Sequence, residues 1–84
     1  MNNRLSRRQR EHICKVKEMP CSLCDMPGPS AAHHIEQSLH YCVVALCWEC
    51  HQGTRGWHGD KTLWRLRKAT ELTALNVTIE RLTT

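Results

Sequence analysis

The chain lacks any apolar run that approaches the roughly 20 residues of a transmembrane helix. Its first ten residues, MNNRLSRRQR, contain no apolar stretch of the kind that a secretory signal needs. Internal repeats and low-complexity tracts are also missing. These absences argue against a membrane-spanning, secreted or repeat protein, and we expect the protein to act in the cytoplasm.

What the chain does have is cysteine. With 84 residues it forms one domain, 1–84, whose hydrophobic core alone gives little stability. Four of the six cysteines form two Cys-x-x-Cys pairs, Cys21 with Cys24 and Cys47 with Cys50. Disulfides are the alternative, but paired spacing in a cytosolic chain indicates a metal.

The two pairs can close one tetrahedral zinc site. Each pair turns two sulfurs toward one point, and the 22 residues between Cys24 and Cys47 loop out and return. That loop carries His33 and His34, and His51 directly follows the last cysteine. We therefore predict a structural Zn²⁺ that holds an imidazole-rich hairpin, and such a hairpin is suited to binding a second, reactive metal ion.

The expected fold class is α+β, with a short hairpin between flanking helices. Ser6 can cap a basic helix within residues 1–20 that runs to about residue 17, since Pro20 blocks its continuation. Residues 32–36 and 41–46 suit the strands of the hairpin.

Residues 47–59 should begin a helix or a tight loop around metal ligands, and residues 60–84 form a C-terminal helical segment. Asp60 can cap a helix that starts at residue 61, because its side chain can accept a backbone hydrogen bond. Apolar residues then recur at helical spacing, with a break expected near Thr70 or Asn76.

Basic residues gather at two places in a chain of net charge +4. The first twenty residues hold six Lys or Arg against two acidic residues, and a second basic group follows the last histidines. Clustered cations that flank a metal site indicate phosphate binding and hence a nucleic acid, whereas a solvated helix face is the alternative. The DNA-binding candidates are Arg7, Arg8, Arg10, Arg55, Lys61 and Arg65.

The histidines suit the chemistry of phosphodiester cleavage. That reaction needs a deprotonated water in line with phosphorus, charge neutralisation on the phosphate and stabilisation of the departing oxygen. A neutral imidazole supplies the first, and a divalent metal with open coordination positions supplies the other two. Because adjacent residues of a strand point to opposite sides, one of His33 and His34 should bind the metal while the other addresses the water.

These residues resemble a known family. The segment AHHI at 32–35, followed by VVALC at 43–47 and the Cys-x-x-Cys-His run that ends at His51, is similar to the HNH, or ββα-metal, nuclease motif in its zinc-knuckle variant. The segment HYCVVALC at 40–47 resembles the phage recombination enhancement (Ref-like) nucleases. The resemblance covers about residues 21–59.

The resemblance implies a metal-dependent DNA endonuclease or nickase with a zinc-stapled ββα-metal domain. It also implies a bacterial host cell, a phage or prophage origin, and recombination proteins as partners. Its catalytic divalent ion would be Mg²⁺, Mn²⁺ or Zn²⁺. Each Cys-x-x-Cys pair corresponds to one zinc knuckle, the first at Cys21 and Cys24 and the second at Cys47 and Cys50. These four cysteines match the family's structural zinc site.

Matched position by position, the resemblance implies a role for each of five histidines. His33 is a ligand of the catalytic ion, and His34 is the general base. His40 stands near the motif's central Asn, which holds the loop. His51 matches the first histidine of the motif helix, as a metal ligand or phosphate contact, and His58 is the remaining candidate ligand.

Two departures from the pattern leave alternatives open. No Asn lies between His34 and Cys47, so His40 either replaces it or leaves the loop less well held. The helical histidines of the family stand four residues apart, whereas His58 follows His51 by seven.

Seven residues of continuous helix would separate two groups by about 10 Å along its axis, too far for one metal ion. Either Gly53 and Gly56 break the helix and fold His58 back, or one of the two histidines is not a ligand. A non-catalytic zinc-knuckle module that binds DNA or a protein partner is the second interpretation of the chain, and a nuclease fold that has lost activity is the third.

Overall fold

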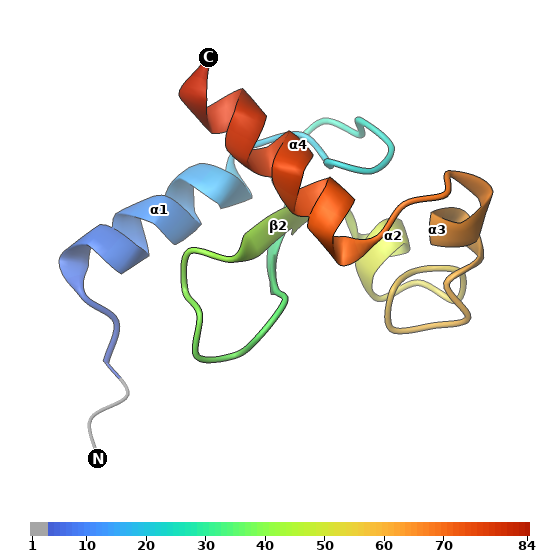
Figure 1. The fold of residues 1–84 in the computed structure, drawn as a ribbon, viewed down its shortest axis with the longest axis horizontal. Coiled ribbons are helices and arrows are strands. Elements are labelled where there is room, and N and C mark those ends of the chain that lie inside the picture. Colours follow the sequence, from blue (N-terminus) through green and yellow to red (C-terminus); the bar gives the residue numbers. More distant parts are fainter. Residues whose placement is uncertain (1–3) are drawn as a thin grey trace.

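A computed structural model describes residues 4–84 of the chain (Figure 1). Within that range a two-stranded antiparallel sheet and four helices form an α+β fold, which confirms the predicted fold class. No helix in residues 4–84 is both long and apolar enough to cross a membrane. The elements follow in the order α1 (Arg7–Lys17), β1 (Ala31–His34), β2 (Val43–Leu46), α2 (Trp48–His51), α3 (Thr62–Leu66) and α4 (Glu71–Thr83).

Helix α1 begins where the sequence predicts. The Ser6 hydroxyl accepts a hydrogen bond from the Gln9 backbone N–H at 3.1 Å, and the Gln9 side chain accepts one from the Ser6 N–H at 2.8 Å. This reciprocal capping box satisfies two donors that a helix start otherwise leaves unpaired. The helix ends at Lys17, before Pro20, and it buries Ile13 and Val16.

The hairpin is shorter than predicted. Strand β1 pairs with β2 so that Ala31 lies opposite Leu46 and His34 opposite Val43. Beyond that register one further backbone bond joins Ile35 N–H to the Cys42 carbonyl at 3.1 Å. The segment between Ile35 and Cys42 folds into turns whose backbone groups bond one another. For example, the N–H of Leu39 donates a hydrogen bond to the carbonyl of Glu36. The ladder therefore ends before residues 36 and 41, where the predicted strands reached.

Strand β2 is buried along its whole length because the hairpin is covered on both faces. Val43 and Ala45 pack with Ile13 and Val16 of α1 in one apolar cluster. Val44 and Leu46 point to the opposite face, where they pack with the cysteine knuckles and with Trp64 and Ala74. In the view of Figure 1, α1 lies at one end of the molecule and α2 and α3 at the other, with the hairpin and α4 between them.

This register separates the two neighbouring histidines. His33 lies opposite Val44 and His34 opposite Val43, so their side chains start from opposite faces of the sheet. His33 is 5% exposed and lies on the face that carries the knuckles. His34 starts from the face that α1 covers.

The C-terminal segment is two helices, with the break at Thr70. The Thr70 hydroxyl caps α4, which runs without interruption past Asn76. Asp60 accepts hydrogen bonds from both the backbone N–H and the hydroxyl of Thr62, at 2.9 and 2.6 Å. Helix α3 nevertheless starts one residue later than predicted, because Lys61 adopts a left-handed conformation with φ of 63°.

A buried hydroxyl pair fastens α4 to the first knuckle. The hydroxyl oxygens of Ser22 and Thr78 lie 2.6 Å apart. The Thr78 hydroxyl also accepts a hydrogen bond from the Ala45 backbone N–H at 3.3 Å and donates one to the Ala74 carbonyl at 3.1 Å. Thr78 is fully buried. Its hydroxyl therefore joins a helix, a strand and a knuckle at one point.

We expect Thr78→Val to lower the free energy of unfolding by about 1–3 kcal/mol, because it leaves buried polar groups without a partner. Urea unfolding of the zinc-loaded protein measures the change. Thr83→Val, at an exposed position of the same helix, is the matched control and should change stability by less than about 0.5 kcal/mol. Equal effects of the two substitutions would show that the hydroxyl pair contributes nothing.

Candidate metal centres

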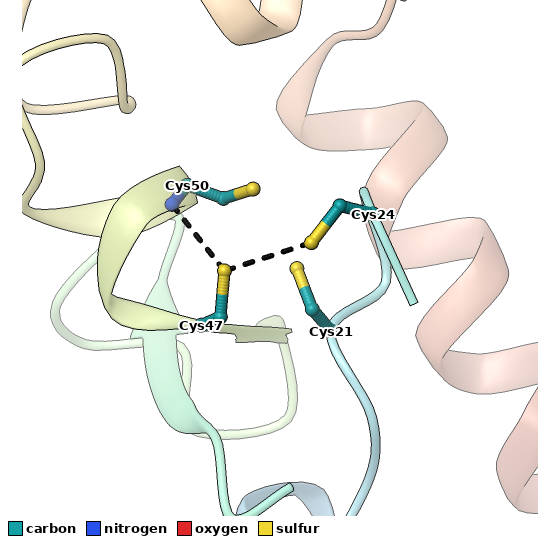
Figure 2. A group of neighbouring side chains, drawn as sticks. All are labelled: Cys21, Cys24, Cys47 and Cys50. Carbon is teal, nitrogen blue, oxygen red and sulfur yellow. Dashed lines mark hydrogen bonds between the residues drawn. The ribbon is translucent and has the colours of Figure 1, made fainter. Parts of the chain in front are cut away.

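The four knuckle cysteines gather at one point although 22 residues separate the two pairs. Their sulfurs all lie within 4.8 Å of one another, and those of Cys24 and Cys47 are 3.7 Å apart (Figure 2). All four are free thiols. A zinc ion with sulfur ligands at about 2.3 Å in a tetrahedron places neighbouring sulfurs about 3.8 Å apart. The cluster therefore fits Zn²⁺, as the spacing of the pairs predicts.

Local backbone geometry turns the sulfurs inward. In the first knuckle the Leu23 N–H points at the Cys21 sulfur at 3.4 Å, and in the second the Cys50 N–H points at the Cys47 sulfur at 3.5 Å. Asp25, which follows the first knuckle, has a left-handed φ of 66°, and this sharp turn reverses the chain. Cys47 is also the N-cap of α2. The second knuckle is thus the start of that helix.

The crowded thiols do not ionise together easily. Burial raises the pKa of the Cys50 thiol, and the neighbouring Cys21 adds to the shift. Burial also raises the pKa of Cys24. Since zinc binds thiolates, a cation at the centre would offset the cost of burying these thiolates beside one another. The donor set is chemically suited to a divalent cation.

Three histidines form a second cluster near the first. His33 of β1, His51 of α2 and His58 of the following turn bring one ring nitrogen each to within 4.8 Å of one another. The Nδ1 atom of His33 and the Nε2 atom of His58 each lie 3.2 Å from Nε2 of His51. Tetrahedral zinc with nitrogen ligands at about 2.05 Å places nitrogens about 3.3 Å apart. The cluster is compatible with a divalent metal ion.

Both His51 and His58 belong to this cluster, because the chain folds His58 back toward His51. Helix α2 ends at His51, and the chain folds back so that the His58 N–H bonds the His51 carbonyl at 3.0 Å. The fold-back needs glycine, since a Cβ on Gly56 would lie 2.8 Å from the Cys50 backbone and one on Gly53 2.7 Å from the Glu49 carbonyl oxygen. The seven-residue spacing therefore corresponds to one short turn of helix followed by a tight loop.

His51 is held in the neutral form. Burial, together with the charges of His33 and His58, lowers its pKa to about 4. A neutral imidazole offers a lone pair to a metal, whereas an imidazolium cannot. His51 is therefore competent as a ligand well below neutral pH.

An acidic residue that the sequence did not single out contacts this cluster. Oε2 of Glu71, in the first turn of α4, lies 2.7 Å from Nε2 of His33. The contact joins residues 38 positions apart. The only local signal is that Glu71 follows a helix cap, a position where acidic residues are common for helix stability alone.

His34 and His40 form a separate pair. Nε2 of His34 lies 3.2 Å from Nδ1 of His40, and the rings meet nearly edge-on with centroids 5.3 Å apart. Burial lowers the pKa of His34, with the charges of His40 and His33 adding to the effect. His34 therefore stays neutral, and able to accept a proton, below its ordinary titration range.

One hollow brings the two groups of histidines together. It has a volume of about 250 Å³, and His34 borders it together with all three members of the metal-compatible cluster. Two glutamines that sequence reasoning missed, Gln37 and Gln52, complete its polar lining. The opposite strand faces of His33 and His34 thus do not prevent both residues from reaching one space.

The basic candidates lie on two separate surfaces. Arg7 pairs with Glu11 at 3.1 Å, and Arg10 donates to the Leu5 carbonyl at 2.9 Å, both at exposed positions on or beside α1. At the other end of the molecule, Lys61 lies 4.8 Å above the Trp57 ring and Arg65 donates to the Asp60 carbonyl. Arg8 and Arg55 are exposed on the first and the second surface respectively. The DNA-binding role of these residues stays a prediction.

Comparison of the chain with protein-family models, with curated proteins and with solved structures finds no match.

We expect the purified protein to carry about one tightly held zinc ion per chain, because binding to the four thiolates contributes directly to folding. Cys24→Ser should lose this zinc and much of the folded structure, as measured by elemental analysis and circular dichroism. Cys14→Ser is the matched control, since Cys14 is an exposed thiol outside the knuckles. A folded, zinc-free protein with disulfides between the knuckles would contradict the prediction.

Proposed function

We propose that the protein is a metal-dependent endonuclease or nickase of the HNH type that hydrolyses DNA phosphodiester bonds. The observation that carries this proposal is the hollow bordered by three convergent imidazoles and by His34. The order of β1, β2 and α2, with a knuckle on either side of the hairpin, supports it because this is the order that the ββα-metal motif requires.

In this proposal His33, His51 and His58 hold the catalytic ion. A divalent ion with an open coordination position would neutralise charge on the phosphate and stabilise the departing oxygen. The three imidazoles suit Zn²⁺ and other first-row ions. Gln37 and Gln52 line the same hollow, and in this proposal their amides donate hydrogen bonds to phosphate oxygens.

His34 acts as the general base and takes a proton from the attacking water. Its depressed pKa keeps the ring neutral at physiological pH, which is the state a base requires. His40 contacts the His34 ring and holds its orientation. The resemblance implies a loop-holding role for His40, and in this proposal its ring takes the place of the Asn amide.

A non-catalytic DNA- or protein-binding module is the alternative. The observation in its favour is that α1, which carries Arg7, Arg8 and Arg10, lies across the hairpin from α2, so DNA could bind α1 without reaching the hollow (Figure 1). Binding of a second divalent ion, beyond one zinc per chain, discriminates between the two functions. Only the nuclease needs it.

We expect His34→Ala to reduce plasmid nicking by about 100-fold to 10,000-fold with little change in DNA affinity, because a general base acts in the transition state. The assay uses added Mg²⁺, Mn²⁺ or Zn²⁺. For the parent, the rate should rise with pH to a plateau, and the midpoint of the rise should lie below the ordinary histidine pKa of about 6.5, since the base is active when neutral and its pKa is lowered.

His12→Ala is the control for this experiment. His12 lies on α1 with its ring against Tyr41, at a centroid distance of 5.0 Å, and it does not border the hollow. It should leave the nicking rate unchanged. Nicking by the His34 variant at the parent rate would show that the base is misassigned.

We expect DNA affinity to fall steeply with salt, since exposed cations contact phosphates and release counterions. Replacing Arg7, Arg8 and Arg10 together by Gln should reduce the slope of log K against log salt by about two to three units. Unrelated DNA sequences should be affected equally, because a phosphate contact reads no sequence. An unchanged slope would remove α1 from the DNA interface.

A further inference from the structure

Within residues 4–84, Glu71 makes the shortest side-chain hydrogen bond to the histidine cluster. Its Oε2 lies 2.7 Å from Nε2 of His33, a ring that is almost fully buried, and Glu71 itself is only partly exposed. On the other side of the same ring, Nδ1 of His33 faces His51 at 3.2 Å. Both nitrogens of His33 are therefore engaged, one by a carboxylate and one by the cluster.

We infer that Glu71 is a positioning residue for the metal-compatible cluster. A carboxylate can only accept, so the His33 hydrogen stands on Nε2 and the Nδ1 lone pair is directed at the point between His51 and His58. Without this partner the ring could carry its hydrogen on either nitrogen. This inference rests on the proposed binding of an ion by the three imidazoles.

The fold holds Glu71 at this position by means that do not involve the cluster. Thr70 and Thr73 form a capping box that fixes the start of α4, with hydrogen bonds of 3.1 and 2.8 Å. The positive end of a helix favours a carboxylate in the first turn. One turn further along, Ala74 is buried against the knuckle face of the hairpin. Helix α4 therefore presents a rigidly placed carboxylate to β1.

The consequence is that the C-terminal helix belongs to the site. Residues 21–59 contain all the histidines and cysteines of the two clusters, whereas Glu71 lies beyond them. A carboxylate that hydrogen-bonds a ligating imidazole orients the ring and increases its basicity, and loss of such a partner typically lowers metal affinity about 10-fold to 100-fold. Helix α4 is thus more than a cover for the sheet.

The test compares Glu71→Ala, Glu71→Gln and the control Glu80→Ala, which removes an exposed carboxylate from the same helix. Each protein first receives one Zn²⁺ for the cysteines. ¹⁵N NMR of the histidine rings then gives the His33 tautomer, and calorimetric titration with further Zn²⁺ gives the affinity of the second site.

For Glu71→Ala we expect about 10-fold to 100-fold weaker binding of the second Zn²⁺ and a mixture of His33 tautomers. Glu71→Gln should keep the Nε2–H tautomer, because its amide oxygen still accepts the same hydrogen, and should lose less affinity. Glu80→Ala should match the parent. If the contact between Glu71 and His33 were purely structural, Glu71→Ala would change neither the His33 tautomer nor the affinity for the second Zn²⁺. An unchanged tautomer or an unchanged affinity would overturn the inference.

The outcomes separate this inference from the proposed nuclease. A parent protein that binds the second Zn²⁺ but never cuts DNA would overturn the nuclease while Glu71 keeps its role. A Glu71→Ala protein that binds the second Zn²⁺ like the parent and still cuts DNA would overturn only the role of Glu71. Failure of the parent to bind a second ion would overturn both.

Discussion

Convergence of the four knuckle sulfurs is the constraint on which the rest of this small protein depends. The sulfurs tie the segment before the hairpin to the start of α2, because Cys47 is both a candidate zinc ligand and the N-cap of that helix. Cys21 and Cys50 are also buried in the apolar cluster on one face of β2. In a chain of 84 residues, apolar burial alone contributes little net stability. One ion bound by the four sulfurs would fix the segment before the hairpin, β2 and α2 relative to one another.

The histidine cluster is built directly on this constraint. His51 immediately follows Cys50, so the position of the imidazole is set by the knuckle beside it. His58 is then placed through backbone bonds to the last turn of α2, including the 2.8 Å bond from the Trp57 N–H to the Cys50 carbonyl. Disruption of the cysteine cluster would therefore displace two of the three imidazoles. The cysteine cluster and the histidine cluster are thus joined by one peptide bond, between Cys50 and His51.

The register of the β-hairpin gives two neighbouring histidines different partners. Pairing with a fully buried strand places His33 on the knuckle face, where Glu71 and His51 engage its ring. The next residue, His34, starts from the other face and meets His40. Neighbouring residues thus experience different surroundings, and both can border one hollow because it lies where the short ladder ends.

Sequence by itself determined the features that depend on neighbours in the chain. The Ser6 cap of α1, the paired cysteines, the break at Thr70 and the alternation of His33 and His34 all follow from interactions over a few residues. The ends of the strands were less predictable. The ladder stops where backbone groups form hydrogen bonds within turns instead of across the strands, and where this happens depends on the conformation of the whole loop.

Tertiary structure decided which of the open alternatives the site adopts. The spacing of His51 and His58 allowed either a long helix or a fold-back, and only the close packing of glycine backbone on the preceding helical turn selects the second. Glu71 reaches His33 from 38 residues away, because α4 packs across β2. No local pattern encodes such a contact, since it depends on how the apolar face of one element fits against another.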